Sequence, residues 1–325
     1  MINRRTMLKS ATAALAAPVF AKSVSAQSVW PSRPVRVVVP YPPAGGADTT
    51  ARLLFTKLGE MWGQQFVIDN RGGAGGTIGE AQVAKAEADG YTILHDATAF
   101  SVNPALYQNL SFDYTKDFAP VFLASLVPNI LVVNKDVEVK TVADVIELAK
   151  KTQGGLDFAS SGNGTLQHLC LELLRHMAQI QINHIPYRGG GLALNDVIGG
   201  QVKFFFANGS SVVGLIQGGQ VKAIAHTGKG QLGTLPDLPA VQDSIAGFEG
   251  YEWNGVFVPA NTSPEIVTKL NAGLNEVLRQ PDIQARLKTL NIDYRENTPD
   301  DFKSFVVTET EKWGKVVKDA GIKLG

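Results

Sequence analysis

Residues 40–54 read PYPPAGGADTTARLL and connect a predicted strand to a predicted helix. The strand is predicted from the apolar run at 35–39, which has the length and composition of a buried strand. The helix is predicted from four apolar residues whose spacing places them on one helix face: Ala51, Leu54, Phe55 and Leu58. Three prolines, two glycines and an aspartate lie at 40–48, so the chain turns sharply just before a helix begins.

The same succession of strand, glycine- or serine-rich turn and helix start occurs three times. The turns read PPAGGAD at 42–48, SSGNGT at 160–165 and YRGGG at 187–191. In open α/β sheets, ligands bind outside the carboxyl ends of the strands, where helix N-termini present backbone N–H groups and positive partial charge. Any one of these turns, taken by itself, is explained by the ordinary preference of turns for glycine and serine. Asp48, taken by itself, is explained as a cap of its own helix. Three turns in two halves of the chain favour a binding site for an anion.

Strand and helix patterns alternate along the rest of the chain. Strands are predicted at 35–39, 66–69, 91–95, 131–133, 156–159, 182–185, 204–207 and 223–225. Helices are predicted at about 48–60, 77–88, 142–151, 166–178, 264–280 and 299–320, and another follows 187–191 and ends at Gly199-Gly200. Thr141 and Ser263 are predicted N-caps, and Pro264 is a favourable first helical residue. Such alternation is typical of an α/β protein with largely parallel sheets.

The first 26 residues have the features of an export signal. Arg4-Arg5 is followed by a short alanine-rich apolar segment and then by Val24-Ser25-Ala26, which fits a signal-peptidase site. The apolar segment at 11–21 is shorter than the roughly 20 residues that a membrane span needs. We therefore expect a twin-arginine-type signal peptide at 1–26, cleaved after about Ala26, and a mature protein in the periplasm. The general secretory route is the alternative for export.

Composition excludes several classes of protein. The chain has 30 basic and 30 acidic residues, and loss of the four basic residues in 1–26 leaves a mature net charge of −4. This balance provides no basic face for nucleic acid. Cys170 is the single cysteine, so no internal disulfide can form, and no Cys/His spacing indicates a metal site. The mature length of about 300 residues is large for one core and favours two lobes.

Nine segments in order along the chain carry a family resemblance. They are PYPPAGGADTTARLL (40–54), VIDNRGGAGGTIG (67–79), ADGYTIL (88–94), NPALY (103–107), DFAPV (117–121), ASSGNGTLQHL (159–169), IPYRGGGLALNDVIGGQV (185–202), LPDLP (235–239) and FVPANTSPEIVTKLN (257–271). Together they resemble the extracytoplasmic solute receptors of the tripartite tricarboxylate transporter (TTT) family, the Bug or TctC-type receptors. The resemblance covers nearly the whole mature chain.

The resemblance implies an α/β fold of the two-lobe periplasmic-binding-protein kind (type II-like), with a ligand cleft between lobes that two hinge strands join. It places lobe 1 at 27–124 plus 252–325 and lobe 2 at 125–251. It implies a monomeric receptor without a cofactor, and not an enzyme. Such a receptor captures a small organic carboxylate (a di- or tricarboxylate, an acidic amino acid or an aromatic carboxylate) and delivers it to the integral-membrane subunits of a TTT permease. A periplasmic sensor that presents its closed form to a signalling partner is the alternative.

The resemblance also implies which residues surround the ligand. Lobe 1 would contribute Tyr41, Ala44, Gly45, Gly46, Asp48 and Thr98. Lobe 2 would contribute Ser160, Ser161, Gly164, Thr165, Arg188, Gly189 and Asn208. We expect the backbone N–H groups of 44–46 to bind the ligand, with Tyr41 and Asp48 on either side of that turn and Asn208 at the rim.

Two groups of side chains allow a second interpretation. Lys203 stands where the family often has an acid, which favours either a second carboxylate on the ligand or an ordinary lysine that faces solvent. Ser161, His168 and Asp196 are the residue types of a hydrolase triad. The G-x-S-x-G motif is absent, however, and nothing in their order indicates that the three side chains meet.

Other features are expected to be structural. The segment GGAGGTIG at 72–79 is rich in glycine but lacks both the G-x-G-x-x-G spacing and the Gly-Lys-Ser/Thr of nucleotide-binding loops. Cys170 lies among leucines and is expected to be buried. Trp253 and Phe257 are expected to pack in the core or at the hinge, with an aromatic platform for the ligand as the alternative.

Overall fold

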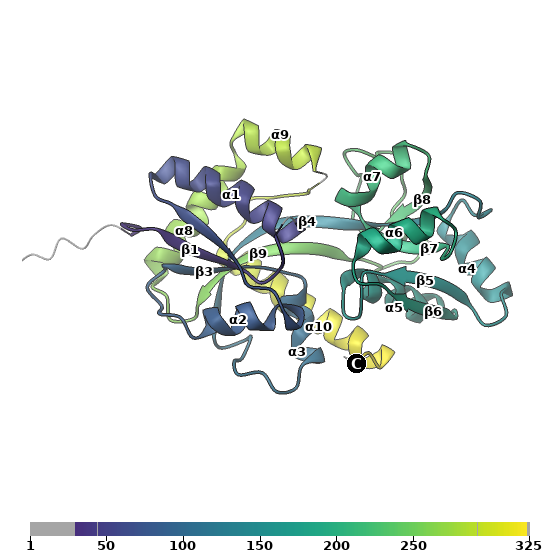
Figure 1. Cartoon of the computed structure of the whole chain (residues 1–325), viewed down its shortest axis with the longest axis horizontal. Coiled ribbons are helices and arrows are strands. Elements are labelled where there is room, and N and C mark those ends of the chain that lie inside the picture. The colour runs from purple at the N-terminus through teal and green to yellow at the C-terminus, as the bar shows by residue number, and fades with distance from the viewer. Residues whose placement is uncertain (1–29, 44, 291, 324–325) are drawn as a thin grey trace, which may run out of the picture.

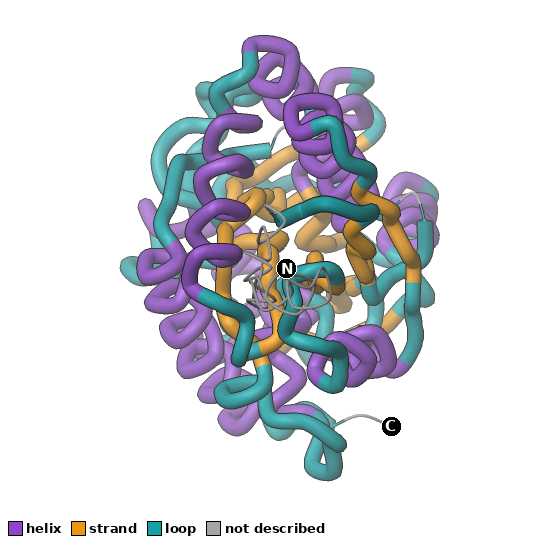
Figure 2. Tube along the Cα trace, turned by 90° about the vertical axis from the view of Figure 1, so that its left-hand side faces the viewer, coloured by secondary structure: helices purple, strands orange, loops and turns teal. Residues whose placement is uncertain are grey.

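The computed structural model describes residues 30–43, 45–290 and 292–323 and shows two α/β lobes next to each other (Figure 1). The sheet runs through both lobes in the order β2-β1-β3-β9-β4-β7-β5-β6, and β8 pairs with β4. Figure 2 shows the strands in the middle of the molecule and the helices around them. The predicted two-lobe α/β fold is confirmed, while the predicted signal peptide at 1–26 lies outside the described residues.

The bounds of the elements are as follows. The strands are β1 (Val35–Val39), β2 (Phe66–Asn70), β3 (Thr92–Ala97), β4 (Phe118–Asn134), β5 (Leu156–Ser160), β6 (Ile182–Pro186), β7 (Phe204–Asn208), β8 (Val221–His226) and β9 (Tyr251–Pro259). The α-helices are α1 (Gly46–Trp62), α2 (Thr77–Ala84), α3 (Ala99–Leu106), α4 (Val142–Lys151), α5 (Leu166–Ala178), α6 (Gly190–Ile198), α7 (Gly209–Gln217), α8 (Pro264–Leu278), α9 (Pro281–Thr289) and α10 (Pro299–Ala320). Short 3₁₀ turns lie at Ala74–Gly76 and Val241–Asp243.

The first lobe is built on β1, with β2 and β3 parallel on either side of it. β9 continues the sheet antiparallel to β3, with Leu94 opposite Phe257. Val37 of β1 packs in a core with α1 and α8, whereas its neighbour Val38 packs in a second core with β9 and α10. Because β1 is covered on both faces, its sequence is a continuous apolar run and not an alternating one.

The second lobe has β5 between β6 and β7, parallel to both, and β7 and β8 antiparallel to β4. Phe204 and Phe206 of β7 point into the core on one face of the sheet, and Phe205 points into the core on the other face. Phe158 of β5 stacks on Phe204 with ring centroids 5.0 Å apart. This lobe is therefore also a sheet with an apolar core on each face.

Two long strands, β4 and β9, cross between the lobes. Their antiparallel pairing begins with Phe118 opposite Pro259 and ends with Pro128 opposite Tyr251. Beyond that point β4 continues into the second lobe, where it pairs with β7 and β8. These strands are the connection that the family resemblance implies.

Helix α10 packs against both lobes (Figure 1). Phe302 and Val306 in its first half belong to the core under β3 and β9. Trp313 and Val317 near its end belong to the core of the second lobe, together with residues of α5. The lobe boundaries at 27–124 plus 252–325 and at 125–251 stay a prediction.

The strongly amphipathic helices are predicted well. Those at Val142–Lys151 and Leu166–Ala178 have the bounds that their patterns indicate. Thr141 caps the first of them through a capping box. Ser263 caps α8, whose first residue is Pro264. Caps and apolar spacing depend only on residues close together in the chain, so the sequence alone predicts where these helices begin and end.

The crossing strands are predicted poorly. β4 begins at Phe118 and not at 131, and β9 is not predicted at all, because proline and glycine within a run oppose a strand. Pro120 lies where the β4–β9 register shifts, a place that tolerates proline. Gly255 is needed for packing, since a Cβ at this position would lie 2.1 Å from Cζ of Phe302.

Three helices, α3, α7 and α9, are also missing from the prediction. α3 contains Pro104, and α7 begins with a glycine and two serines, so neither has a strong helical pattern. Pro281 is interpreted from the sequence as the stop of α8, whereas it is the first residue of α9. Proline suits the first position of a helix as well as the position after one.

The expected packing of single residues is confirmed. Cys170, Trp253 and Phe257 have no exposed surface. Among the described residues, no helix combines the length and the apolar character that crossing a membrane requires.

Candidate ligand-binding site

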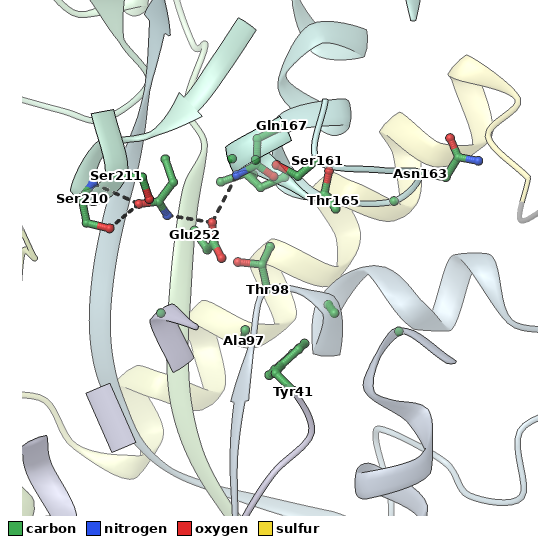
Figure 3. A pocket seen from close by; sticks show the side chains of 18 of the residues that line it. Tyr41, Ala97, Thr98, Ser161, Asn163, Thr165, Gln167, Ser210, Ser211 and Glu252 are labelled. Carbon is green, nitrogen blue, oxygen red and sulfur yellow. Dashed lines mark hydrogen bonds between the residues drawn. The ribbon is translucent and has the colours of Figure 1, made fainter. Parts of the chain in front are cut away.

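A cleft of about 610 Å³ lies where residues of the two lobes face each other (Figure 3). Its walls include the starts of five helices, α1, α3, α5, α6 and α7. The lining residues at these starts are Gly46, Thr98, Ala99, Thr165, Leu166, Gln167, Gly190, Gly191, Asn208, Ser210 and Ser211. The first N–H groups of a helix have no partner within the helix, and its N-terminus carries roughly half a positive charge. The backbone of the cleft therefore favours an anion.

Charged side chains are nearly absent from this cleft. Glu252 is the one charged side chain among the described residues that line it, and none of these residues is lysine or arginine. The attraction for an anion has to come from backbone dipoles and neutral donors.

Asn70, at the end of β2, holds the turn before α1 in place. Its Nδ2 donates to the carbonyl of Tyr41 and to the carboxylate of Asp48, at 3.0 Å in each case. Asp48 is buried in the first turn of α1 and also pairs with Arg52 at 2.9 Å. Asp48 thus shapes the turn through protein partners, while Tyr41 and Gly46 line the cleft.

A pair of buried acids lies behind Tyr41. The Tyr41 hydroxyl donates to Asp96 at 2.8 Å, and the Tyr114 hydroxyl donates to Glu80. Burial and the neighbouring Asp96 raise the pKa of Glu80 to about 10, and burial raises the pKa of Asp96 to about 6. Burial thus shifts both carboxyl groups toward the protonated form. Oε1 of Glu80 accepts from Nδ2 of Asn103, a cleft residue, at 3.3 Å, so the acid pair supports the wall of the cleft.

Two stacked histidines support the turn before α5. The N–H of Gly164 donates to Nδ1 of His168 at 3.1 Å, and Oγ1 of Thr165 accepts from the His168 N–H. His168 stacks on His184 with centroids 3.8 Å apart, and Nε2 of His184 is 2.5 Å from Oγ of buried Ser160. Burial and the neighbouring His168 lower the pKa of His184 to about 4. Gly164 lines the cleft, but its N–H is already bonded to a side chain.

The turn before α6 contributes glycines. Gly189 is the N-cap of α6 and has φ of 129°, a conformation that favours glycine. Gly190 and Gly191 line the cleft. A Cβ at Gly190 would lie 3.1 Å from Oγ of Ser161, so the two turns of this lobe meet. Arg188 is exposed and does not line the cleft.

Glu252 lies on the crossing strand β9 and binds side chains of the second lobe. Its Oε2 accepts from Nε2 of Gln167 at 3.3 Å and from Nδ2 of Asn208 at 2.9 Å (Figure 3). Gln167 is in the first turn of α5, and Asn208 is the N-cap of α7, where its Oδ1 accepts from the N–H of Ser210. These bonds tie the strand to two helix starts.

Thr98 begins α3 and binds the same strand. Its Oγ1 donates to the carbonyl of Tyr251 at 3.3 Å and accepts from the N–H of Trp253 at 2.9 Å. Thr98 is buried, yet it borders the cleft. The Thr98 hydroxyl, which we expected to contact a ligand, instead donates its proton to the carbonyl before Glu252 and accepts from the N–H after it.

The structure brings together about half of the predicted site. The cleft is lined by Tyr41, Gly46, Thr98, Ser161, Gly164, Thr165 and Asn208. Five other predicted residues lie in the same turns but outside the lining: Gly45, Asp48, Ser160, Arg188 and Gly189. Ala44 lies outside the described residues. Ligand contacts by any of them stay predictions.

Sequence reasoning did not predict several lining residues, among them Gly75, Asn103, Tyr107, Gln167 and Glu252. Gly75 belongs to GGAGGTIG, and Gln167 follows the turn before α5, so a search for every glycine-rich turn and helix start would have found both. Glu252 lies between Tyr251 and Trp253, and no local pattern marks it.

The two alternative interpretations find no support in the geometry. Lys203 is exposed and precedes β7, whereas the cleft residue Asn208 is at the other end of that strand. His168 binds the backbone of its own turn, and Asp196 accepts from the hydroxyl of Tyr187 at 2.7 Å, so the proposed triad members have separate partners. Within the described part of the chain, no three His, Cys, Asp or Glu side chains are grouped as a metal ion would require.

The two-lobe α/β fold that forms this cleft is the architecture of the solved periplasmic binding protein BugD, to which this chain is 34% identical with a TM-score of 0.76. The family model for "Tripartite tricarboxylate transporter family receptor" (TctC) matches residues 50–322. Protein BugT of Bordetella pertussis is 32% identical over 317 residues, which cover 97% of this chain and 95% of BugT. The chain belongs to the tripartite tricarboxylate transporter family of receptors, the TctC or Bug receptors.

Solved structures agree with this assignment. Rpa4515 of R. palustris, solved with adipate, superposes with a TM-score of 0.80 at 34% identity and covers 91% of this chain and 100% of its own. MatC of Rhodopseudomonas palustris, solved with bound malate, has a TM-score of 0.75 at 30% identity, with coverage of 88% and 99%. The predicted receptor class is confirmed, and this class is one of binding proteins and not of enzymes.

Proposed function

We propose that this receptor captures a small organic carboxylate in the cleft and delivers it to a TTT membrane permease. The observation that carries the proposal is the gathering of five helix starts around one cleft that has no basic side chain among its described lining residues. Backbone donors of this kind bind anions without a full opposing charge. The adipate and malate of the two solved relatives are both dicarboxylates and support the same ligand class.

The bonds available are sufficient for useful affinity. A hydrogen bond to a charged group contributes about 1.5–3 kcal/mol, and a helix N-terminus adds roughly 0.3–1 kcal/mol. Four or five such bonds offset the cost of lobe closure and leave about −8 kcal/mol, which corresponds to a micromolar Kd. Since both lobes line the cleft, a ligand that contacts both favours the closed form, and only its differential affinity shifts the balance.

The remaining parts of the proposal follow from the family. The ligand contacts are the residues of the three turns that line the cleft, with Ser161 and Gly46 as donors from opposite lobes. We place the mature protein in the periplasm as a monomer, after removal of the signal peptide at 1–26. The hinge is the pair of crossing strands.

A thermal-shift screen of the purified receptor tests the ligand class. The panel contains adipate, malate, citrate, glutamate and benzoate, with glucose and putrescine as compounds that lack a carboxylate. An acid at about 100 times its Kd stabilises the receptor by about 2.7 kcal/mol. Stabilisation by glucose or putrescine alone would contradict the proposal. Delivery is tested by uptake of the same radiolabelled acid, which should be lost in cells without the receptor and restored when it is supplied.

A further inference from the structure

Glu252 raises a chemical problem for a receptor of carboxylates. It is half-buried at the cleft, and it is the one acid among the described lining residues. Its Oε2 accepts two hydrogen bonds, from Gln167 and Asn208. Its Oε1 accepts none from any residue in the described ranges. A carboxylate oxygen with free acceptor capacity therefore remains at a cleft whose backbone favours anions.

The side-chain donors around Glu252 already form hydrogen bonds to other protein atoms. One N–H of Gln167 and one of Asn208 point to Oε2. The hydroxyl of Thr98 donates to the carbonyl of Tyr251, the residue before Glu252. This part of the cleft consequently offers a ligand a negative acceptor, whereas the helix starts offer N–H donors. Like charges brought together away from bulk water repel each other, and opposite charges attract.

We propose that Glu252 is a specificity-determining residue that receives an ammonium group of the ligand. The receptor then selects carboxylates that also carry an ammonium group, which means amino acids, over acids of the same length that lack one. This inference rests on the proposed function, because the helix starts must hold the ligand carboxylate for the ammonium group to reach Glu252. Specificity of this kind combines an attraction for one ligand with repulsion of its competitor.

Matched pairs of ligands isolate the contribution of the ammonium group. Succinate is compared with 4-aminobutanoate, adipate with 6-aminohexanoate, and glutarate with L-glutamate, each by calorimetric titration of the purified receptor. In the first two pairs the ammonium group replaces one carboxylate, and in the third it is added while both carboxylates stay; the member without an ammonium group is called the diacid of its pair. In the pair that binds most tightly, we expect the amino acid to bind about ten- to a hundredfold more tightly than the diacid, the factor that a hydrogen bond between charged groups typically supplies. This comparison uses the unaltered receptor, so it does not depend on a variant that folds.

The variant Glu252→Gln tests the residue itself. The amide oxygen can still accept from Gln167 and Asn208, while the NH₂ group replaces the free acceptor by a donor. We expect the preference for the amino acid to fall at least tenfold, through weaker binding of the amino acid and tighter binding of the diacid. Glu138→Gln is the matched control, because Glu138 is exposed and does not line the cleft. It changes the net charge equally and should leave the preference within twofold.

The outcomes separate this inference from the proposed function. If the diacid of every pair binds more tightly to the unaltered receptor, or if Glu252→Gln moves the preference no more than Glu138→Gln does, Glu252 only ties β9 to the second lobe and the inference is wrong, although the receptor still binds carboxylates. If no member of any pair and no acid of the screening panel binds, the proposed function fails together with the inference.

Discussion

Gly46→Pro removes one backbone N–H from the cleft and leaves the surrounding fold intact. Gly46 is the first residue of α1, a position where proline is favoured. The residue before it, Gly45, has φ −79° and ψ 173°, the extended conformation that proline demands of its predecessor. A Cβ at Gly46 meets no atom within 4 Å. The substitution is therefore compatible with the native backbone.

The expected changes in stability and binding have opposite signs. Proline lowers the entropy of the unfolded chain and should stabilise the receptor by about 0.4–1 kcal/mol. Loss of a hydrogen bond to a charged carboxylate costs about 1.5–3 kcal/mol, which weakens binding by roughly 10- to 150-fold. We therefore expect a receptor that melts at the same or a higher temperature and binds its acid at least tenfold more weakly.

Calorimetric titration with the tightest-binding acid of the screening panel measures the affinity, and thermal melting followed by circular dichroism measures the stability. Gly46→Ala is the control, since it keeps the N–H and adds a side chain in open space. Its affinity should stay within about twofold of the unaltered receptor. Equal affinities for the Pro and Ala variants would refute the reasoning that the start of α1 holds the ligand.

Two further predictions concern stability. Burial and the neighbouring Asp96 raise the pKa of Glu80 from 4.5 to about 10. Between these two pH values the folded protein binds a proton that the unfolded chain releases. The free energy of unfolding should therefore fall as the pH rises from about 4.5 to about 10. Glu80→Gln, which keeps an acceptor for Tyr114, should flatten that dependence in urea unfolding followed between pH 5 and 9; an unchanged slope would show that another group is responsible. Gly255→Ala places a Cβ against the ring of buried Phe302 and should destabilise by about 1–3 kcal/mol, as overpacked cores do; a melting temperature equal to that of the unaltered protein would mean that the ring moves aside freely.

Local signals account for the part of the fold that the sequence predicts. Thr141 and Ser263 cap their helices, because a cap needs only a side-chain oxygen that accepts a hydrogen bond from a backbone N–H two or three residues further along the chain. The crossing strands depend on distant partners. Gly255 is acceptable in β9 because Phe302, from α10, occupies the space of the missing side chain, and no window of sequence contains both residues.

The candidate site likewise contains residues that local patterns predict and residues whose position depends on distant parts of the chain. Gly46 and Ser161 are in turns between a strand and a helix, and their position at the cleft follows from the rule for open α/β sheets. Glu252 reaches the cleft because β9 passes between the lobes, where it meets Gln167 from 85 positions and Asn208 from 44 positions away in the chain. Asp48 is hydrogen-bonded to Asn70, which is 22 residues away in the chain. The sequence of its own turn therefore does not indicate that Asp48 lies outside the cleft lining.

Helix α10 limits how the molecule can change shape. It has 22 residues, about 33 Å of rigid rod, with one end fixed by Phe302 and the other by Trp313. Close-packed interiors resist sliding, so we expect any hinge motion about β4 and β9 to keep both ends of α10 in their cores. The two lobes should then separate less on the side where α10 lies than on the opposite side.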